Sequence, residues 1–420
     1  MNFKLYNSCE LVSETPKNHD HSVGFHDVKP FNKNNNNLIL IHRYPLKSLF
    51  TETKSKIDIC IWNYKENNLI EIDKTEAWSW EQGSRLQWIN ENSFIYNQFN
   101  NNKLVSCIYD IEKKNKKILD SSIYSLNYKT KRILSINYAR LWSHWKGYGY
   151  NASDPSKDIN FPKNDGIYLI DFNGNKKLIL SIYDAVDLCE LTKINRPFFL
   201  SHPTFNPEGN KFVSLLRFIN DMGNLISYFI CTDINKNKST VLAKERVSHF
   251  EWIDNDNIIV WSRNLPNQLQ KVRLNKYFEK FFVSNVKLLL KLLSKNIQSN
   301  LLSTFHHLIN TNNGKTIKFG SNFLGEDSHP QISNSRKFII CDTYPDHQDN
   351  QKLFLYDIIK DKLHLIGEFK IANYLVKNKI KYDLHPRWDS TDKLINIDSS
   401  HDGSRQSYII SIEKLINQIN

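Results

Sequence analysis

The sequence lacks the features of several large protein classes. Its 420 residues contain no apolar run of about 18 residues, the length that crosses a membrane. Six cysteines without a Cys-x-x-Cys pair are too few for a disulfide scaffold or a zinc ribbon. The N-terminal stretch MNFKLYNSCELVSETPKNHDHS has no apolar segment of a secretory signal. We therefore expect a cytoplasmic protein with free thiols and no transmembrane segment.

Familiar catalytic motifs are also missing. The chain has no glycine-rich phosphate-binding loop, no Gly-x-Ser-x-Gly and no His-Glu-x-x-His. These absences exclude the usual signatures of nucleotide-binding proteins, serine hydrolases and zinc proteases.

Positive charge is in excess. Lys+Arg minus Asp+Glu is 56 − 44 = +12, and the isoelectric point is near 9.1. A basic surface favours an acidic partner such as nucleic acid, anionic lipid or a uronate-rich polysaccharide. Alternatively, the excess is scattered over solvated turns such as residues 113–117 and 235–238, which are rich in Lys and Asn. Nucleic acid is not expected, because no compact Lys/Arg patch with interleaved aromatics is visible.

A repeat organises the chain. Short runs of β-branched and aromatic residues alternate with turns of Asn, Asp, Gly and Lys, and several runs end in Asp. The clearest units begin His-Pro at 202, 329 and 385, and a looser one begins at His249. Counting degenerate copies, unit starts fall near residues 26, 86, 124, 202, 249, 329 and 385.

Repeats of roughly 40–60 residues with four short strands are typical of β-propeller blades. We therefore predict an all-β fold, a single seven-bladed β-propeller domain over residues 1–420, closed by its termini. No linker rich in Pro, Gly or Ser divides the chain. Residues 142–166 are expected to form a loop, and residues 275–298 a basic amphipathic helix inserted in the propeller.

Four consecutive unit starts carry a histidine. If the register is shared, the imidazoles of His202, His249, His329 and His385 converge at one mouth of the central channel. Convergent neutral imidazoles are ligands for Zn²⁺ or Mn²⁺. The alternative is that each histidine caps its own blade through hydrogen bonds to the backbone.

Two further regions contain candidate substrate-binding residues. Arg387, His401 and Arg405 can grip a carboxylate, since a guanidinium fork matches its geometry; the alternative is a buried Asp–Arg network that holds the closing blade. Tyr148 lies in a glycine-aromatic loop whose rings can stack on sugars, although such aromatics are often core residues.

The His-Pro-x-x-Ser/Asn units and the end DLHPRW…DSSHDGSRQ resemble seven-bladed propeller polysaccharide lyases over roughly residues 20–415. The likeness is nearest to ulvan lyases and more distant to oligogalacturonate lyases. It implies β-elimination, in which the C5 proton of a uronate is removed and the C4 oxygen is expelled, on an acidic oligosaccharide or polysaccharide. By resemblance, His26 and His42 match the two catalytic histidines, and Tyr124 and Arg140 match the tyrosine and arginine. The resemblance also implies a structural zinc.

Two functions remain open from the sequence. One is a uronate-specific carbon–oxygen lyase, in which His26, His42, Tyr124 and Arg140 meet in one cleft. The other is a non-catalytic propeller that binds a glycan or a protein, in surface polysaccharide synthesis for example. Because propellers have many functions, the fold does not decide between them, and the oligomeric state is unknown.

Overall fold

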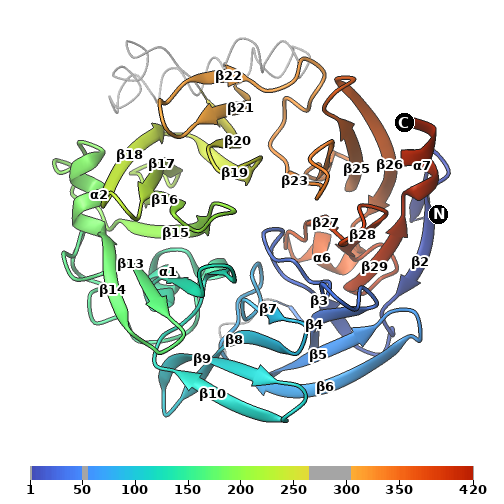
Figure 1. Cartoon of the computed structure of the whole chain (residues 1–420), viewed down its shortest axis with the longest axis horizontal. Coiled ribbons are helices and arrows are strands. Elements are labelled where there is room, and N and C mark those ends of the chain that lie inside the picture. The colour runs from blue at the N-terminus through green and yellow to red at the C-terminus, as the bar shows by residue number, and fades with distance from the viewer. Residues whose placement is uncertain (1, 50–54, 264–303, 420) are drawn as a thin grey trace.

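Seven antiparallel sheets form a ring in the computed structural model, which describes residues 2–49, 55–263 and 304–419 (Figure 1). The predicted all-β seven-bladed propeller is confirmed. The helix predicted at 275–298 lies outside the described residues.

The first three blades follow one another along the chain, and each has four strands from the centre outward. Blade 1 contains β3 (Asp20–Ser22), β4 (Leu38–Tyr44), β5 (Ile57–Asn63) and β6 (Asn68–Thr75). Blade 2 contains β7 (Gln87–Asn90), β8 (Ser93–Asn100), β9 (Lys103–Asp110) and β10 (Asn115–Leu119). Blade 3 contains β11 (Ser125–Asn127), β12 (Arg132–Ser135), β13 (Gly166–Asp171) and β14 (Lys176–Ser181).

Blades 4 and 5 repeat this order. Blade 4 contains β15 (Phe199–Phe205), β16 (Lys211–Ile219), β17 (Leu225–Asp233) and β18 (Lys238–Ala243). Blade 5 contains β19 (Val247–Trp252), β20 (Asn257–Arg263), β21 (Thr304–Asn310) and β22 (Thr316–Lys318).

The N-terminal segment closes the ring at blades 6 and 7. Blade 6 contains β23 (Gln331–Ile332), β24 (Phe338–Asp342), β25 (Asn350–Asp357) and β26 (Lys362–Lys370), with β1 (Phe3–Leu5) as a fifth, outer strand. Blade 7 contains β27 (Arg387–Trp388), β28 (Leu394–Ser399) and β29 (Gln406–Ser411), and its outer strand is β2 (Glu10–Glu14). The two ends of the chain therefore lie side by side (Figure 1).

The described residues also form short helices, which are α1 (Tyr138–His144), the 3₁₀ turn η1 (Lys146–Tyr148), α2 (Ile182–Leu188), α6 (Asn373–Lys377) and α7 (Glu413–Ile419). Two of them, α1 and η1, correct the expectation of a loop over residues 142–166. The strand ends at Ser135 because Asn137 caps a helix, its side-chain oxygen accepting a hydrogen bond from the backbone N–H of Arg140.

Six of the seven inner strands begin within three residues of the expected starts. Blade 1 differs, since its inner strand β3 begins at Asp20, six residues before the expected start near 26. The backbone N–H groups of Val23 and Gly24 bond to Asp398 of blade 7 rather than to β4, and Gly24 has a φ of +108°. The chain therefore leaves the sheet here, and residues 25–30 lie outside the β3–β4 ladder.

The core lies between neighbouring sheets, as the alternation of apolar residues along each strand dictates. Ile39, Ile41 and Trp62 of blade 1, for example, pack with Ile409 of blade 7. In several blades a polar residue of the second strand also links to the beginning of the next blade. His42 accepts from the N–H of Ser84, Asn97 from that of Ile123, Asp342 from that of His385, and Asp398 from that of Val23.

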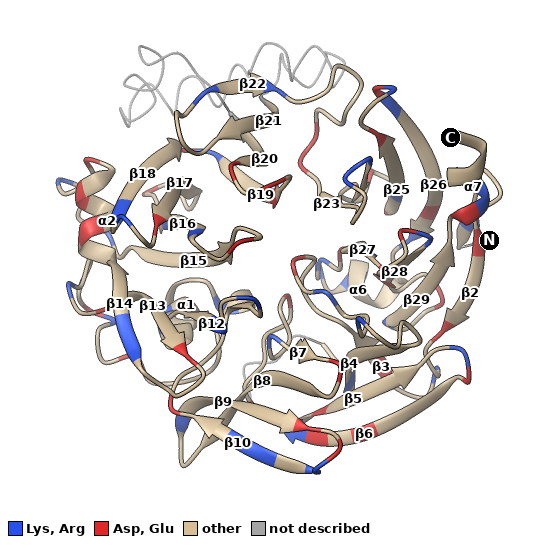
Figure 2. Ribbon diagram, viewed as in Figure 1, with Lys and Arg blue, Asp and Glu red and all other residues tan. Residues whose placement is uncertain are grey.

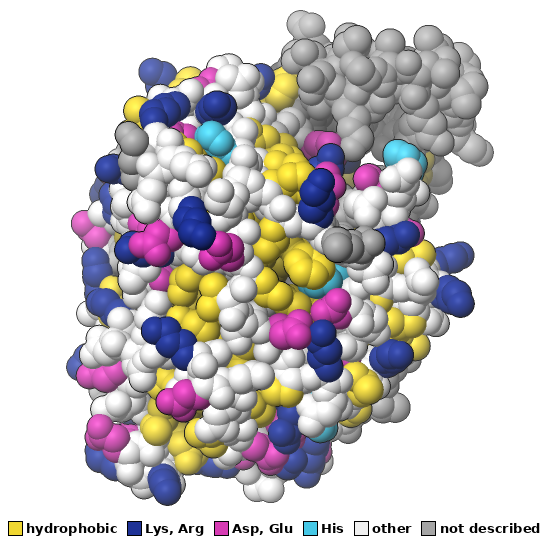
Figure 3. All heavy atoms as spheres, turned by 90° about the vertical axis from the view of Figure 1, so that its right-hand side faces the viewer, with side chains coloured by type: hydrophobic (Ala, Val, Ile, Leu, Met, Phe, Trp, Pro, Cys, Tyr) yellow, Lys and Arg dark blue, Asp and Glu magenta, His cyan; other side chains and the backbone are white. Residues whose placement is uncertain are grey.

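Charge is dispersed over the outside of the molecule. Lys and Arg mark several outer strands, among them β10 and β14 (Figure 2). On the side shown in Figure 3, basic and acidic side chains alternate with hydrophobic ones. In the described part of the chain, none of the helices has the length and apolar character needed to cross a membrane.

Candidate active site at the centre of the ring

Five histidines from five blades surround one phenylalanine at the centre of the ring. The ring centroid of Phe25 lies 5.1 Å from those of His202 and His385, 6.1 Å from His249 and 6.2 Å from His329. His26, the next residue, has its ring 5.1 Å from that of His329. All six side chains are buried or nearly so. The predicted convergence of the blade-start histidines is thus present in the structure.

The loop that carries Phe25 and His26 is held by blade 7. Arg387 donates hydrogen bonds to the carbonyl oxygens of Gly24 and Phe25, and its guanidinium also pairs with Asp398 at 3.2 Å. A Cβ added to Gly24 would lie 3.0 Å from the carbonyl oxygen of Gln82, so glycine also serves the close approach of blade 2. The loop with Phe25 and His26 is therefore fixed by hydrogen bonds from blade 7 and by close packing against blade 2.

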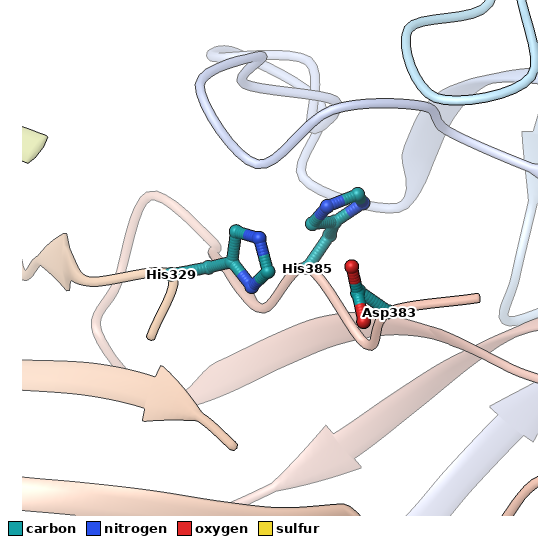
Figure 4. Close-up of side chains that lie close together, drawn as sticks. All are labelled: His329, Asp383 and His385. Carbon is teal, nitrogen blue, oxygen red and sulfur yellow. The ribbon is translucent and has the colours of Figure 1, made fainter. Parts of the chain in front are cut away.

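Three side chains bring possible metal ligands together. One donor atom each from His329, Asp383 and His385 lies within 4.8 Å of the other two, and all three residues are buried. The two imidazoles and the carboxylate converge from the segments before β23 and β27 (Figure 4). Among the described residues, no other three His, Cys, Asp or Glu side chains have donor atoms this close together.

Hydrogen bonds orient both imidazoles of this triad. Nδ1 of His329 donates to Asp342 at 2.8 Å, and Nδ1 of His385 donates to the carbonyl oxygen of Gly24 at 3.0 Å. Because Nδ1 is protonated in each ring, Nε2 is the nitrogen that can bind a metal. In His329 a metal would first displace the Nε2 proton that the raised pKa of this ring retains, whereas Nε2 of His385 is buried without a hydrogen-bond partner. An imidazole held at one nitrogen by a carboxylate or carbonyl is the usual arrangement of a metal-bound histidine. Residues and donor set fit a transition metal.

The electrostatics of the triad depend on neighbouring carboxylates. Burial alone would lower the pKa of His329, but Asp342 raises it to about 9. Burial raises the pKa of Asp383 to about 6, while His329 opposes this rise. The pKa of His385 lies well below its usual value, because the ring is buried beside His329 and Arg387.

The other two histidines predicted as ligands have different partners. Nδ1 of His249 donates to Asp327 at 3.0 Å, and the two rings of His249 and His329 are 4.1 Å apart. Burial and His329 lower the pKa of His249, so its Nε2 carries a lone pair at neutral pH. Nδ1 of His202 lies 3.5 Å from a guanidinium nitrogen of Arg217. Because Nδ1 then accepts, the proton of neutral His202 is on Nε2, which cannot bind a metal in that form.

Of the four residues expected to be catalytic by resemblance, only His26 joins this cluster, and its Nδ1 is buried without a partner. His42 is fully buried, donates from Nδ1 to the carbonyl of Ser22 and bonds through Nε2 to Ser84. Tyr124 is also fully buried; its hydroxyl accepts from Gln82 at 2.6 Å. The ring of Tyr124 lies 6.0 Å from that of His202.

Arg140 lies in the α1 segment rather than at the centre. Its guanidinium donates to the backbone carbonyls of Phe198, Ser156, Ile159 and Asn160 and lies 3.7 Å from Asp154. These bonds fix the long connection between β12 and β13. The structure thus does not bring Arg140 together with His26, and the guanidinium has no free fork for a substrate.

The three predicted carboxylate-gripping residues of blade 7 also have partners inside the protein. Arg387 holds the Gly24–Phe25 loop, and Arg405 pairs with Asp20 at 3.1 Å with its guanidinium 4.0 Å above the ring of Trp80. His401 is buried against Phe3 and Tyr408. This arrangement corresponds to the alternative of a buried Asp–Arg network. Tyr148, in contrast, is half-buried and lies beside His202, with ring centroids 5.4 Å apart.

Sequence reasoning missed Asp383, Asp327, Asp342, Tyr344 and Arg217. Asp383 and Asp327 each stand two residues before a blade-start histidine, a spacing that could have identified them. Asp342 is one of the aspartates that end a strand-length run, and nothing in the sequence distinguishes it from the others. The signal for Arg217 was an arginine inside the apolar run of a central strand.

Comparison with solved structures gives the same architecture. An oligogalacturonate lyase in complex with manganese matches with a TM-score of 0.62 and 10% identity, over 97% of this chain and 96% of that one. The oligogalacturonate lyase of Vibrio parahaemolyticus matches with a TM-score of 0.60 and 11% identity, over 98% and 97%. No protein-family model matches the chain, and no curated protein matches it in sequence. At these identities the likeness establishes the propeller fold.

Proposed function

We propose that the protein is a metal-dependent carbon–oxygen lyase that cleaves uronate-containing oligosaccharides by β-elimination. The observation that carries this proposal is the triad of His329, Asp383 and His385, whose donor atoms lie within 4.8 Å of one another. The full-length likeness to oligogalacturonate lyases, one of them a manganese complex, supports it. The residues used differ from the ulvan-lyase set, because His42 and Arg140 are bonded within the protein.

His329, Asp383 and His385 would hold Mn²⁺ or Zn²⁺, whose ligand preferences include imidazole and carboxylate. When bound, such an ion neutralises the uronate carboxylate and so makes the neighbouring C5 proton more acidic. Asp342 and the carbonyl of Gly24 keep both imidazoles in the tautomer that presents Nε2. The buried, unpartnered Nε2 of His385 is the atom that most needs a ligand.

His249 is the proposed base. Its hydrogen bond to Asp327 places the free lone pair on Nε2 and stabilises the imidazolium that forms on proton transfer. The C5 proton moves to this Nε2, the C5–H electron pair becomes the C4–C5 double bond, and the C4–O bond breaks. Tyr344 supplies a proton to the expelled oxygen. Burial raises the pKa of Tyr344, which keeps it protonated, and its ring lies 6.2 Å from that of His249.

The location proposed for this activity is the cytoplasm. All six cysteines are buried, unpaired thiols, which fits a reducing compartment.

The test is incubation of the purified protein with a panel of uronate oligosaccharides, with and without Mn²⁺, followed by the ultraviolet absorbance of the unsaturated product. Metal content is measured in parallel by elemental analysis. We expect His385→Ala to lose both metal and activity, and His249→Ala to lose activity while it keeps the metal. His347→Ala, an exposed histidine, is the matched control. Unchanged metal content and activity in His385→Ala would overturn the proposal.

A further inference from the structure

The outer strand of blade 7, β2, has one edge that no strand in the described part of the chain covers. It pairs with β29 alone. The register of this pairing shifts between Leu11 and Ser13, so Val12 has no partner on β29. Because the free edge of a strand presents unpaired backbone N–H and C=O groups, it is a template for pairing with another chain.

The outer strands of the other six blades each carry lysine. The residues are Lys4 in β1, Lys74 in β6, Lys116 and Lys117 in β10, Lys176 and Lys177 in β14, Lys238 in β18, and Lys318 in β22. Proteins protect exposed edges with lysine, because pairing with another strand would desolvate the ammonium group. Strand β2 has the sequence ELVSE, without lysine or arginine. Of the seven outer strands that the structure describes, only β2 therefore lacks this protection.

Two neighbouring aliphatic side chains of β2 face solvent. Leu11 is 39% exposed and Val12 is 46% exposed. An exposed isoleucine also occurs on other outer strands, but Ile118 of β10, for example, directly follows Lys117. Figure 3 views this side of the ring, and hydrophobic side chains gather along the middle of the face that it shows. An apolar pair on an edge without lysine favours association with a partner.

The charges at the two ends of β2 fit a second copy of the same strand. Glu10 forms an ion pair with Lys414 of α7, and Glu14 forms one with Lys17 at 3.0 Å. If two copies run antiparallel with Val12 opposite Val12, Glu10 of one copy lies opposite Glu14 of the other. Each glutamate brings its own lysine to that position, so both ends of the interface contain two acidic and two basic groups. The charge pattern of the edge is therefore complementary to itself.

We propose that the protein forms a two-fold symmetric dimer in which the β2 strands of two copies pair antiparallel, with Val12 at the symmetry axis. The two copies of blade 7 then form one continuous sheet across both propellers. A two-fold interface uses the same surface of each subunit, and a self-complementary edge meets this requirement. Because β2 has only five residues, the interface is small, and the dimer forms as the protein concentration rises. The interface lies on the outer rim, so the proposal does not depend on the activity proposed for the centre of the ring.

The first experiment measures the dissociation constant of the dimer by sedimentation equilibrium over a wide range of protein concentrations. The wild type should pass from monomer to dimer. In Val12→Lys two ammonium groups meet at the axis, so we expect the dissociation constant to rise by about a hundredfold or more. The melting temperature of the monomer should stay the same, because Val12 faces solvent. Ile118→Lys, which changes an exposed residue of β10, is the matched control and should dimerise as the wild type does.

The second experiment tests the register of the two strands by cross-linking. Directly opposite residues of antiparallel strands have Cα atoms about 4.5–5.5 Å apart, which suits a disulfide. Val12→Cys should therefore form a disulfide-linked dimer under mild oxidation. The six native cysteines are buried, so they do not compete. Ile70→Cys, at an equally exposed position of β6, is the control and should stay uncross-linked.

Each result supports or overturns the dimer. A wild-type protein that stays monomeric at every concentration would overturn it, and the edge would then be left for a different partner. A dimer that Val12→Lys leaves intact would place the interface elsewhere and would also overturn the proposal. If Val12→Lys fails to fold, the cross-linking of Val12→Cys decides, and equal cross-linking of Val12→Cys and Ile70→Cys counts against the paired strands.

Discussion

The ion pair between Arg405 and Asp20 should hold the last blade to the first. Both side chains are almost fully buried, and Nε of Arg405 donates to Asp20 at 3.1 Å. Replacing Arg405 by Met leaves volume similar but strands the Asp20 carboxylate in the core. Breaking a buried pair in this way costs about 3–5 kcal/mol. The lost contact of the guanidinium with the rings of Trp80 and Tyr44 adds to this cost.

The assay is the free energy of unfolding from urea denaturation, measured for Arg405→Met, Asp20→Asn and the double variant. The double variant should recover most of the loss, because no buried charge is left unpaired. Lys393→Met, which removes an exposed ion pair with Glu413, should change stability by about 1 kcal/mol or less. The reasoning fails if Arg405→Met keeps wild-type stability and instead raises the KM for a uronate substrate, as expected of a substrate-binding arginine.

Three further outcomes are expected. Asp342→Asn should weaken Mn²⁺ binding by about 10–100-fold in competition titrations, because the carboxylate orients His329, whereas Asp357→Asn should not. Burial raises the pKa of Glu251 to about 8 from its ordinary 4.5, so the contribution of this residue to folding stability is fully present below about pH 4.5 and is lost as the pH rises to about 8. In Glu251→Gln the melting temperature should depend less on pH over this range. An unchanged pH dependence would contradict the assignment. His42→Ala should lose about 1–3 kcal/mol of stability, because the substitution leaves the N–H of Ser84 and the carbonyl of Ser22 without a hydrogen-bond partner. The variant should keep its metal. A variant that is stable but inactive would instead support His42 as a catalytic residue.

The fold could be predicted from the sequence because each blade carries its own local signal. Strand-length apolar runs and turns of Asn, Asp and Gly recur seven times, so each blade can be predicted from its own segment of the sequence. Blade 1 was misplaced because the expected start near 26 lies in the segment that has already left the inner strand β3. The cause lies outside the blade, in the carboxylate of Asp398, which takes the N–H groups that would otherwise pair in the sheet. A local pattern cannot show such a long-range competitor.

The candidate site was predictable in part for the same reason. The positions of His329 and His385 follow from the repeat, since equivalent positions of neighbouring blades face the same axis. The role of each histidine depends instead on what its Nδ1 contacts. Asp327 for His249 and Arg217 for His202 are 78 and 15 residues away in the sequence. Arg140 was wrongly expected at the site for a related reason. Its guanidinium donates hydrogen bonds to carbonyls of the long connection between β12 and β13, and that connection has no repeat pattern from which these bonds could be predicted.

One structural position explains how a metal site can arise from this repeat. The polar residue near the end of the second strand ties its blade to the next one, through His42, Asn97, Asp342 and Asp398 in turn. In blade 6 this residue is an aspartate whose own blade begins with a histidine, so one carboxylate bonds both the ring of His329 and the backbone of His385. The hydrogen bonds that join blades 6 and 7 therefore also hold the ring of His329 and the backbone of His385 in the candidate metal site. Four of the seven blades show this link among the described residues, and of these four residues only Asp342 also bonds the imidazole of a blade-start histidine. The repeat alone therefore does not identify the blade that contributes to the candidate metal site, whereas the three-dimensional contacts do.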